Sequence, residues 1–359
     1  MSRFLLAGGG TGGHVNPLLA LGQFLRDSGH EAIALGTKEG LESRLVPNRG
    51  FELLTIPRLP LPRKLSFALV GFPFRLLAAS LKVARIIRAR EIDCVVGFGG
   101  YASAPAYIAA KLTRTPLVVH EANALAGFAN KLGARLTSFV GVSFSNSDLK
   151  QATLTGMPIR AEIVKSASGY DQQQARVELG LDPMLPTLLV TGGSLGAKSV
   201  NDTVIQSLEQ LNAAGIQVLH IVGEKADLDE ITRPGYRRMG YCQVMDVAIA
   251  ASNFAVSRAG SSTVSEFTAT GLPALYVPYP VGNGEQRLNA LTVVEAGGGL
   301  LVADRDFTPE FVQSSLIPVI SHAKGLKTMS KNAKSLGIVD ATERLGALVL
   351  TALDTNTRD

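Results

Sequence analysis

The stretch RFLLAGGGTGGH at residues 3–14 decides the fold. Its apolar run Phe4–Ala7 is typical of a short buried strand, and the glycines before His14 predict a tight turn that enters a helix. The same design recurs in TLLVTGGSLGAKS at residues 187–199, and a related one occurs in DCVVGFGGYASAP at residues 93–105. A strand, a glycine turn and a helix in this order are typical of parallel α/β sheets. The recurrence predicts two similar half-chains.

Short apolar runs alternate with helical patterns along the rest of the chain, so we expect an α/β fold whose parallel sheets are covered by helices on both faces. Strands are expected at Phe4–Ala7, Ala32–Leu35, Cys94–Val96, Leu117–Val119, Leu188–Val190, Val218–Ile221, Phe254–Val256 and Ala274–Val277. The polar segment at residues 156–174 is the expected linker. Because open α/β sheets bind ligands at the carboxyl ends of their strands, we expect the site in a cleft between two domains.

The composition excludes several classes of protein. The chain has 359 residues, of which 46% are hydrophobic and 18% charged, so it can form a core and is too long for one ordinary domain. Its two cysteines, Cys94 and Cys242, predict neither a disulfide framework nor a metal cluster. No pair of histidines or carboxylates has metal-ligand spacing, and no G-x-S-x-G motif occurs. We therefore expect no metal ion and no bound cofactor, and a serine hydrolase is not indicated.

The glycine turns indicate phosphate binding, because glycine lets backbone amides approach an anion and the following helix begins with unpaired N–H groups. A nicotinamide dehydrogenase needs an acidic residue at the end of the second strand, which here ends in Gly36 and Thr37, whereas Glu31 lies at its other end. A P-loop NTPase needs a second glycine where Ala197 stands. Any one turn could serve only the chain connection, but three together favour a diphosphate held by amides without a metal ion.

His14 is the candidate catalytic base. It follows the first glycine turn at the start of the predicted helix, where its ring can project toward a ligand. An imidazole can accept a proton from a hydroxyl nucleophile at neutral pH. A purely structural histidine is the alternative.

Three further polar groups follow predicted strands. HEAN at residues 120–123 can contact a ligand, with helix capping by Asn123 as the alternative. Glu266 can accept both hydroxyls of a ribose, or it can belong to a capping box of its own helix. NGEQRLNA at residues 283–290 places amides and charges on a loop that enters a helix, as recognition of sugar hydroxyls requires.

Charge is unevenly distributed along the chain. Residues 1–160 carry 19 Lys and Arg against 9 Asp and Glu, whereas residues 161–359 carry 16 against 21. Residues 53–90 hold eight basic residues, no acidic one and many large apolar ones. Such a segment can lie on an anionic membrane surface. The alternatives are a core-facing helix with a basic outer side and a nucleic-acid patch, although no nucleic-acid-binding module is recognisable and we expect no nucleic-acid partner.

Membrane insertion and secretion are not indicated. No apolar window of about 18 residues occurs, so we expect no bilayer-spanning segment. The apolar run before the first glycines is too short for a secretory signal, so we expect the protein to stay in the cytoplasm.

Taken together, the motifs resemble one family. They are GGGTGGHVNP, GFGGYASAP, HEANALAG, GMPIR, GGSLGAKSVN, SRAGSSTVSE, GLPALYVPYP and GEQRLNA, in this order. The chain is similar over nearly its whole length to the UDP-N-acetylglucosamine:N-acetylmuramyl-(pentapeptide) pyrophosphoryl-undecaprenol N-acetylglucosaminyltransferases (MurG family) of bacterial cell-wall synthesis. The resemblance implies a glycosyltransferase-B fold of two Rossmann-like domains facing across a cleft. It implies an acceptor- and membrane-facing domain at residues 1–160, a UDP-GlcNAc-binding domain at 161–338, and a last helix within 339–359 that returns to the first domain.

The resemblance also implies the activity and its residues. UDP-GlcNAc would donate GlcNAc to the C4 hydroxyl of the muramic acid in lipid I, with inversion, giving lipid II, and His14 would be the catalytic residue. Substrate contacts carry over to Thr11, Gly12, Gly13, Tyr101, Asn123, Arg160, Ser194, Cys242, Thr263, Glu266, Gln286 and Asn289. Among these, the backbone near Cys242 would face uracil, Glu266 the ribose and Ser194 the diphosphate. Ala122 and Glu285 depart from the family pattern, where glutamine and an amide are frequent.

An acceptor carried on a polyprenyl diphosphate implies a peripheral protein at the cytoplasmic face of the cell membrane, with an anionic membrane surface and other cell-wall synthesis proteins as partners. Two other functions remain open from the sequence. A UDP-GlcNAc 2-epimerase would act on UDP-GlcNAc alone, and a noncatalytic UDP-sugar-binding protein would need no acceptor site.

Overall fold

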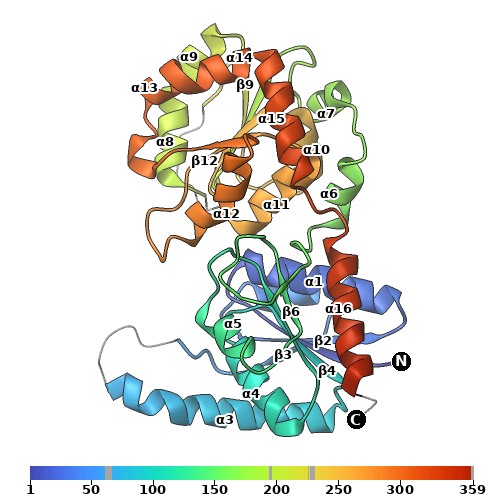
Figure 1. Cartoon of the computed structure of the whole chain (residues 1–359). Coiled ribbons are helices and arrows are strands. Elements are labelled where there is room, and N and C mark those ends of the chain that lie inside the picture. Colours follow the sequence, from blue (N-terminus) through green and yellow to red (C-terminus); the bar gives the residue numbers. More distant parts are fainter. Residues whose placement is uncertain (61–66, 194–195, 225, 227–230, 357–359) are drawn as a thin grey trace. The chain divides into compact units, whose positions relative to one another are not determined.

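The chain folds into two compact units. The structure is a computed structural model, and it describes residues 1–60, 67–193, 196–224, 226 and 231–356. Unit 1 comprises Met1–Ile159 and Asp340–Asp359, and unit 2 comprises Arg160–Val339 (Figure 1). Each unit has one parallel sheet with helices packed on it, which confirms the predicted fold class.

Unit 1 is built on a sheet with strand order β3-β2-β1-β4-β5-β6-β7. Its elements are β1 Arg3–Ala7, α1 Gly12–Asp27, β2 Glu31–Gly36, α2 Glu42–Asn48, β3 Leu53–Thr55, α3 Phe67–Ala89, β4 Cys94–Gly97, α4 Ser103–Thr113, β5 Leu117–Glu121, α5 Phe128–Gly133, β6 Val140–Val142, β7 Thr153–Leu154 and α16 Ala341–Asn356. Strands β1 and β4 are hydrogen-bonded neighbours, with Ala7 opposite Gly97. The first two glycine turns therefore leave the sheet side by side.

The last helix, α16, completes the core of unit 1. It packs against α1, β4 and β5, where Leu345 and Val349 are buried among Phe4 and Leu6 of β1 (Figure 1). Gly346 makes the close approach to α1 possible, since a Cβ atom there would overlap the ring of Phe24. The terminal segment thus belongs structurally to the unit that begins the chain.

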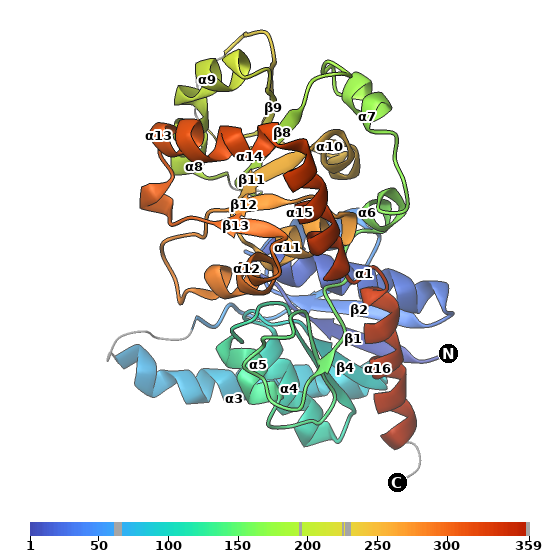
Figure 2. The same ribbon diagram turned by 45° about the horizontal axis from the view of Figure 1, so that its top comes forward.

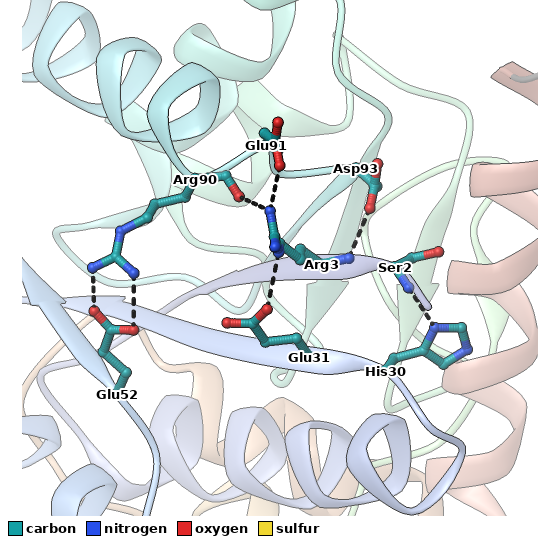
Figure 3. A network of polar contacts seen from close by, with 8 residues as sticks. All are labelled: Ser2, Arg3, His30, Glu31, Glu52, Arg90, Glu91 and Asp93. Carbon is teal, nitrogen blue, oxygen red and sulfur yellow. Dashed lines mark hydrogen bonds and ion pairs between the residues drawn. The ribbon is translucent and has the colours of Figure 1, made fainter.

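An ionic network ties the amino ends of the unit 1 strands together (Figure 3). Arg3 donates to Glu31 at 3.0 Å and to Glu91 at 2.6 Å, and Arg90 pairs with Glu52 at 2.5 Å. These side chains are substantially exposed, so each pair contributes little stability. Glu31 therefore lies at the amino ends of the strands, whereas the glycine turns follow the carboxyl ends, as the sequence predicts.

Unit 2 repeats the design with strand order β10-β9-β8-β11-β12-β13, and Figure 2 shows β11, β12 and β13 side by side. Its elements are α6 Ala161–Ser166, α7 Gln172–Glu178, β8 Thr187–Thr191, α8 Lys198–Gln206, α9 Leu208–Ala213, β9 Gln217–Ile221, β10 Tyr236–Met239, α10 Met245–Ala251, β11 Phe254–Ser257, α11 Ser261–Thr270, β12 Ala274–Tyr276, α12 Glu285–Glu295, β13 Gly299–Leu301, η1 Asp304–Asp306, α13 Pro309–Phe311, η2 Val312–Leu316, α14 Ile317–Ser321 and α15 Ala323–Ser335. The hydrophobic core on one side of this sheet contains residues of β8, α8, β11 and η2, including Val190, Val204 and Leu316.

All eight predicted strands are present, the last of them ending at Tyr276 rather than Val277. The expected linker is partly wrong, because residues 156–174 contain α6 and the start of α7. Helix α6 buries Ile163 and packs on α10 and α11 of unit 2. Its apolar side chain makes it part of that unit.

Candidate functional site

The third glycine turn leads from β8 to α8 in unit 2. Gly193 and Gly196 have φ of +82° and +76°, and a Cβ atom on Gly196 would overlap the carbonyl oxygen of Val222 at the end of β9. The N-cap residue Ala197 has no side-chain acceptor, and no described residue accepts from the first N–H groups of α8, which suits the helix start to an anion. Ser194, the predicted diphosphate contact, lies outside the described residues.

Arg258 joins the ends of four elements beside this turn. It forms an ion pair with Asp304 of η1, donates to Ser199 of α8 at 3.0 Å, and donates to the carbonyls of Val277 and Pro278 after β12 at 3.1 and 3.2 Å. Ser199 in turn donates to Asp304 at 2.8 Å. Arg258 was not among the predicted site residues, although a cation directly after a strand is a usable signal. It holds the start of α8 in place.

Glu266, one turn inside α11, is paired with Arg160. Both contacts fall on Oε1, at 3.3 Å from Arg160 Nε and 3.1 Å from Nη2. Burial raises the pKa of the Glu266 carboxyl, and Arg160 opposes the rise. The capping-box alternative is wrong, because the N-cap residue of α11 is Gly260 and Glu266 lies beyond the first turn, aimed at Arg160.

Cys242 belongs to the same neighbourhood. Burial raises the pKa of its thiol, while the nearby positive charge of Arg160 works in the opposite direction. The residue is only 4% exposed, so its thiol is shielded from solvent. The structure thus brings together three of the predicted contact residues, Arg160, Cys242 and Glu266.

The remaining predicted residues of unit 2 flank α11 and α12. Asn289 is buried and donates to the carbonyl of Ala259, so its amide N–H supports the loop that starts α11. Gln286 is half-buried and accepts from the backbone N–H of Tyr279 at 2.9 Å. Thr263 is half-buried on α11. Near it, the hydroxyl of Ser262 is buried and has no hydrogen-bond partner among the described residues.

His14 lies in unit 1 between two glycine turns. Its Nδ1 is 3.0 Å from the carbonyl oxygen of Gly9 and 3.3 Å from Thr11 Oγ1. A Cβ atom on Gly99 would lie 3.0 Å from His14 Nε2, and one on Gly100 would overlap the carbonyl of Gly9. The second turn, with φ of +95° at Gly99, therefore needs glycine in order to pass beside the imidazole.

Thr11, Gly12 and Gly13 form the entry to α1. Thr11 is the exposed N-cap residue and caps no N–H with its side chain, so the first amides of the helix stay open. Gly12 and Gly13 are the first helical residues and present no side chain that would screen them.

A buried carboxylate that the motifs did not reveal completes this turn. Glu42, the first residue of α2, is fully buried and accepts from the backbone N–H of Gly10 and from Thr37. The carboxylate expected at the end of β2 in a dinucleotide site is thus supplied by the next helix, but it is buried and already bonded, so it offers nothing to a ribose.

The HEAN segment is mostly internal. His120 and Glu121 belong to β5 and are buried, and burial lowers the pKa of His120 to about 4. Glu121 accepts from the N–H of Asn123 at 2.8 Å and of Gly127 at 3.0 Å. The capping alternative for Asn123 is wrong, since α5 starts later with Gly127 as its N-cap residue. Asn123 itself is half-buried on the loop.

Tyr101 is half-buried directly after the second turn. Its hydroxyl accepts from Arg58 Nη2 at 3.0 Å, and the guanidinium carbon of Arg58 lies 4.6 Å from the ring centroid. Arg58 belongs to the basic stretch, so this contact connects that stretch to the second glycine turn.

The comparisons with known proteins agree with this arrangement. Residues 4–141 match the glycosyltransferase family 28 N-terminal domain and residues 187–345 match the glycosyltransferase family 28 C-terminal domain. The crystal structure of MurG from Acinetobacter baumannii superposes with a TM-score of 0.79 at 25% identity, covering 98% of this chain and 100% of that one. A UDP co-structure of MnaA from S. aureus has a TM-score of 0.66 at 13% identity and supports the fold alone.

Relatives of known name match at much higher identity. A protein of Leifsonia xyli subsp. xyli is 51% identical over 355 residues, covering 98% of this chain and 99% of the relative. A protein of Streptomyces coelicolor is 47% identical over 360 residues, covering 99% of both. Both are named UDP-N-acetylglucosamine--N-acetylmuramyl-(pentapeptide) pyrophosphoryl-undecaprenol N-acetylglucosamine transferase. The chain therefore belongs to the MurG family of glycosyltransferases.

Proposed function

We propose that this protein transfers GlcNAc from UDP-GlcNAc to the C4 hydroxyl of the muramic acid in lipid I, forming lipid II. The observation that carries the proposal is the 51% identity, over 98% of the chain, to a relative named for this transfer. The two glycine-turn units fit the reaction, because one substrate carries a nucleoside diphosphate and the other a polyprenyl diphosphate. No observation favours the epimerase or the noncatalytic binding protein.

The donor is assigned to unit 2. Glu266 accepts hydrogen bonds from the ribose hydroxyls, the backbone near Cys242 faces uracil, and the turn before α8 holds the diphosphate. The pairing of Arg160 with Glu266 Oε1 supports this assignment, because the guanidinium opposes the rise that burial causes in the pKa of the carboxyl. Thr263, Gln286 and Asn289 contact the donor from α11 and α12. Arg258 positions the phosphate turn through Ser199.

The acceptor is assigned to unit 1, with His14 as general base. Thr11, Gly12, Gly13 and Asn123 of the same unit are assigned as donor contacts, and Tyr101 as a further substrate contact. The C4 hydroxyl attacks the anomeric carbon of GlcNAc while its proton passes to the imidazole. The bond from the anomeric carbon to the diphosphate oxygen breaks as the new bond forms, so UDP leaves and the configuration inverts. Charge on the leaving diphosphate is stabilised by the backbone amides and helix start at the third turn.

The protein works at the cytoplasmic face of the membrane as a peripheral protein. None of the described helices is both long and apolar enough to span a bilayer. Helix α3 supports surface binding: Phe74, Leu77 and Leu81 are exposed by 73%, 51% and 45%, and Arg75 and Lys82 are exposed beside them. An exposed apolar stripe flanked by cations suits an anionic headgroup layer.

A transfer assay tests the proposal. Purified protein is incubated with labelled UDP-GlcNAc and a short-chain lipid I analogue, with EDTA present, while UDP release and label in the lipid fraction are followed. We expect UDP and labelled lipid to appear together and only when the acceptor is present. Release of UDP without acceptor would favour an epimerase, and nucleotide binding without turnover would favour a binding protein. Either result would overturn the proposal.

A further inference from the structure

One peptide group in the first glycine turn contacts an ionisable side chain through its N–H and another through its carbonyl oxygen. The N–H of Gly10 donates to Glu42 Oε2 at 2.8 Å, and the carbonyl oxygen of Gly9 lies 3.0 Å from His14 Nδ1. These two atoms belong to the same planar, conjugated amide. Glu42 and His14 are therefore connected through a single peptide bond, although their side chains do not touch each other directly in this contact.

The surroundings of Glu42 are built to keep a carboxylate there. Its Oε1 accepts from both the backbone N–H and the hydroxyl of Thr37, each at 2.8 Å. A Cβ atom on Gly9, Gly36 or Gly40 would overlap the Glu42 side chain, so a larger residue at any of these positions would displace the carboxylate. Burial of a carboxylate is costly unless hydrogen bonds offset it, and here three donors do so. Both carboxyl oxygens are used as acceptors, Oε2 by Gly10 and Oε1 by Thr37.

The contact with Gly9 favours one tautomer of the imidazole. A peptide carbonyl can only accept, and it lies 3.0 Å from His14 Nδ1, nearer than Thr11 Oγ1 at 3.3 Å, so the geometry favours the proton on Nδ1. The other nitrogen, Nε2, then carries the lone pair and is free to take a proton. An anionic acceptor on the N–H of an amide increases the negative charge on its carbonyl oxygen, because hydrogen bonds in a chain polarise one another. That oxygen then stabilises the positive charge that the ring acquires when it accepts the acceptor's proton.

We propose that Glu42 is a positioning residue for His14 and acts through the Gly9–Gly10 peptide, so that carboxylate, peptide and imidazole hold Nε2 as the proton acceptor. The inference rests on the proposed role of His14 as general base. It adds a residue from α2 to the machinery of transfer and explains why Gly9, Gly36 and Gly40 surround one carboxylate.

Glu42→Gln is the decisive variant. A glutamine amide has one oxygen, which accepts, and one NH₂ group, which donates. The backbone N–H of either Gly10 or Thr37 would therefore face this NH₂ group and lose its acceptor. General base catalysis contributes about 10²–10⁴-fold, and we expect loss of the relay to lower kcat by about 10- to 100-fold while the KM for UDP-GlcNAc and the affinity for UDP stay unchanged. Glu42→Asp keeps the charge on a shorter side chain that cannot span both partners, so its kcat should lie between those of the wild type and Glu42→Gln.

Glu31→Gln is the matched control. It makes the same chemical change on β2, at the far end of the strand and in the exposed network of Figure 3. We expect wild-type kcat. The chain has five histidines, so the ring nitrogens of His14 can be assigned by ¹⁵N NMR against a His14→Gln sample. In the wild type we expect the proton on Nδ1, and in Glu42→Gln a mixture of the two tautomers.

The outcomes separate the two proposals. If His14→Ala keeps wild-type turnover, the catalytic role of His14 fails, and with it the basis of the relay. If His14→Ala is inactive but Glu42→Gln matches Glu31→Gln in kcat, or wild-type His14 is protonated at Nε2, the relay alone is overturned. Should Glu42→Gln not fold, Glu42→Asp decides, because wild-type kcat in that variant contradicts the relay.

Discussion

Removal of Arg160 should destabilise unit 2 far more than neutralisation of its partner. Glu266 is only 8% exposed, and burial raises the pKa of its carboxyl above the ordinary 4.5. A carboxyl whose pKa is raised in the folded state favours folding below its unfolded pKa, and this contribution is lost as pH rises through the folded pKa. Ionisation of Glu266 as the pH rises is therefore a cost to the stability of unit 2, and Arg160 offsets part of that cost.

The magnitude follows from the geometry. Removal of one partner of a buried ion pair costs about 3–5 kcal/mol, because the other charge is left unpaired. The Arg160 side chain is 28% exposed and both of its contacts fall on one oxygen, which places the cost of Arg160→Ala near the low end, at about 3 kcal/mol. Glu266→Gln removes the charge itself and should stay within about 1 kcal/mol of the wild type. The double variant should be close to Glu266→Gln.

Thermal unfolding by calorimetry measures this difference. For a unit of this size about 3 kcal/mol corresponds to a fall in Tm of roughly 6–12 °C in Arg160→Ala at pH 7. The fall should shrink as the pH is lowered and Glu266 takes up a proton, because the uncharged carboxyl no longer needs a partner charge. In the same proteins, titration calorimetry should show about 10- to 100-fold weaker UDP binding for Glu266→Gln, since one charged acceptor is replaced by a neutral amide. Equal stability of Arg160→Ala and Glu266→Gln at pH 7 would refute the reasoning.

Three further predictions concern other parts of the molecule. Burial lowers the pKa of His120 in unit 1 and of His220 in unit 2 to about 4. Both units should therefore lose stability as the pH falls from about 6.5 to 4, because the histidines take up protons on unfolding. Calorimetry at a series of pH values checks this. Arg258→Lys cannot reproduce the forked contacts to Asp304 and Ser199, so UDP affinity should fall by about tenfold in titration calorimetry, and unchanged affinity would contradict the assigned positioning. Leu77→Ser removes apolar surface from the exposed side of α3 and should weaken sedimentation with anionic vesicles about fivefold. Val177→Ser, which removes an exposed apolar side chain from unit 2, should not.

Much of the fold could be predicted because its signals are local. An apolar run followed by a glycine turn predicts both the strand and the point where the chain leaves the sheet, as in Phe4–Gly10. The strands that escaped prediction, such as β6 Val140–Val142 and β7 Thr153–Leu154, are too short for a pattern to form. They exist because neighbouring strands offer them hydrogen bonds, which is a property of the assembled sheet.

The candidate site was predictable only where its residues share a turn. His14 and the glycines around it stand together in the sequence, and so do Glu266 and the start of its helix. Glu42 and Arg258 contact partners on other elements. The spacing of residues in the sequence does not predict such contacts. The reverse error occurred at His120 and Glu121, which look like ligand contacts in sequence but are buried within β5, since burial depends on tertiary packing.

The most direct measurement of the central claim is single-turnover transfer by His14→Ala beside its UDP affinity. UDP is assigned to unit 2, and proton transfer to His14 of unit 1. We therefore expect transfer of labelled GlcNAc to a lipid I analogue to slow by about 10²–10⁴-fold while the Kd for UDP stays within about twofold of the wild type. Wild-type transfer rates in His14→Ala, or a loss of transfer that parallels a loss of UDP binding, would contradict it.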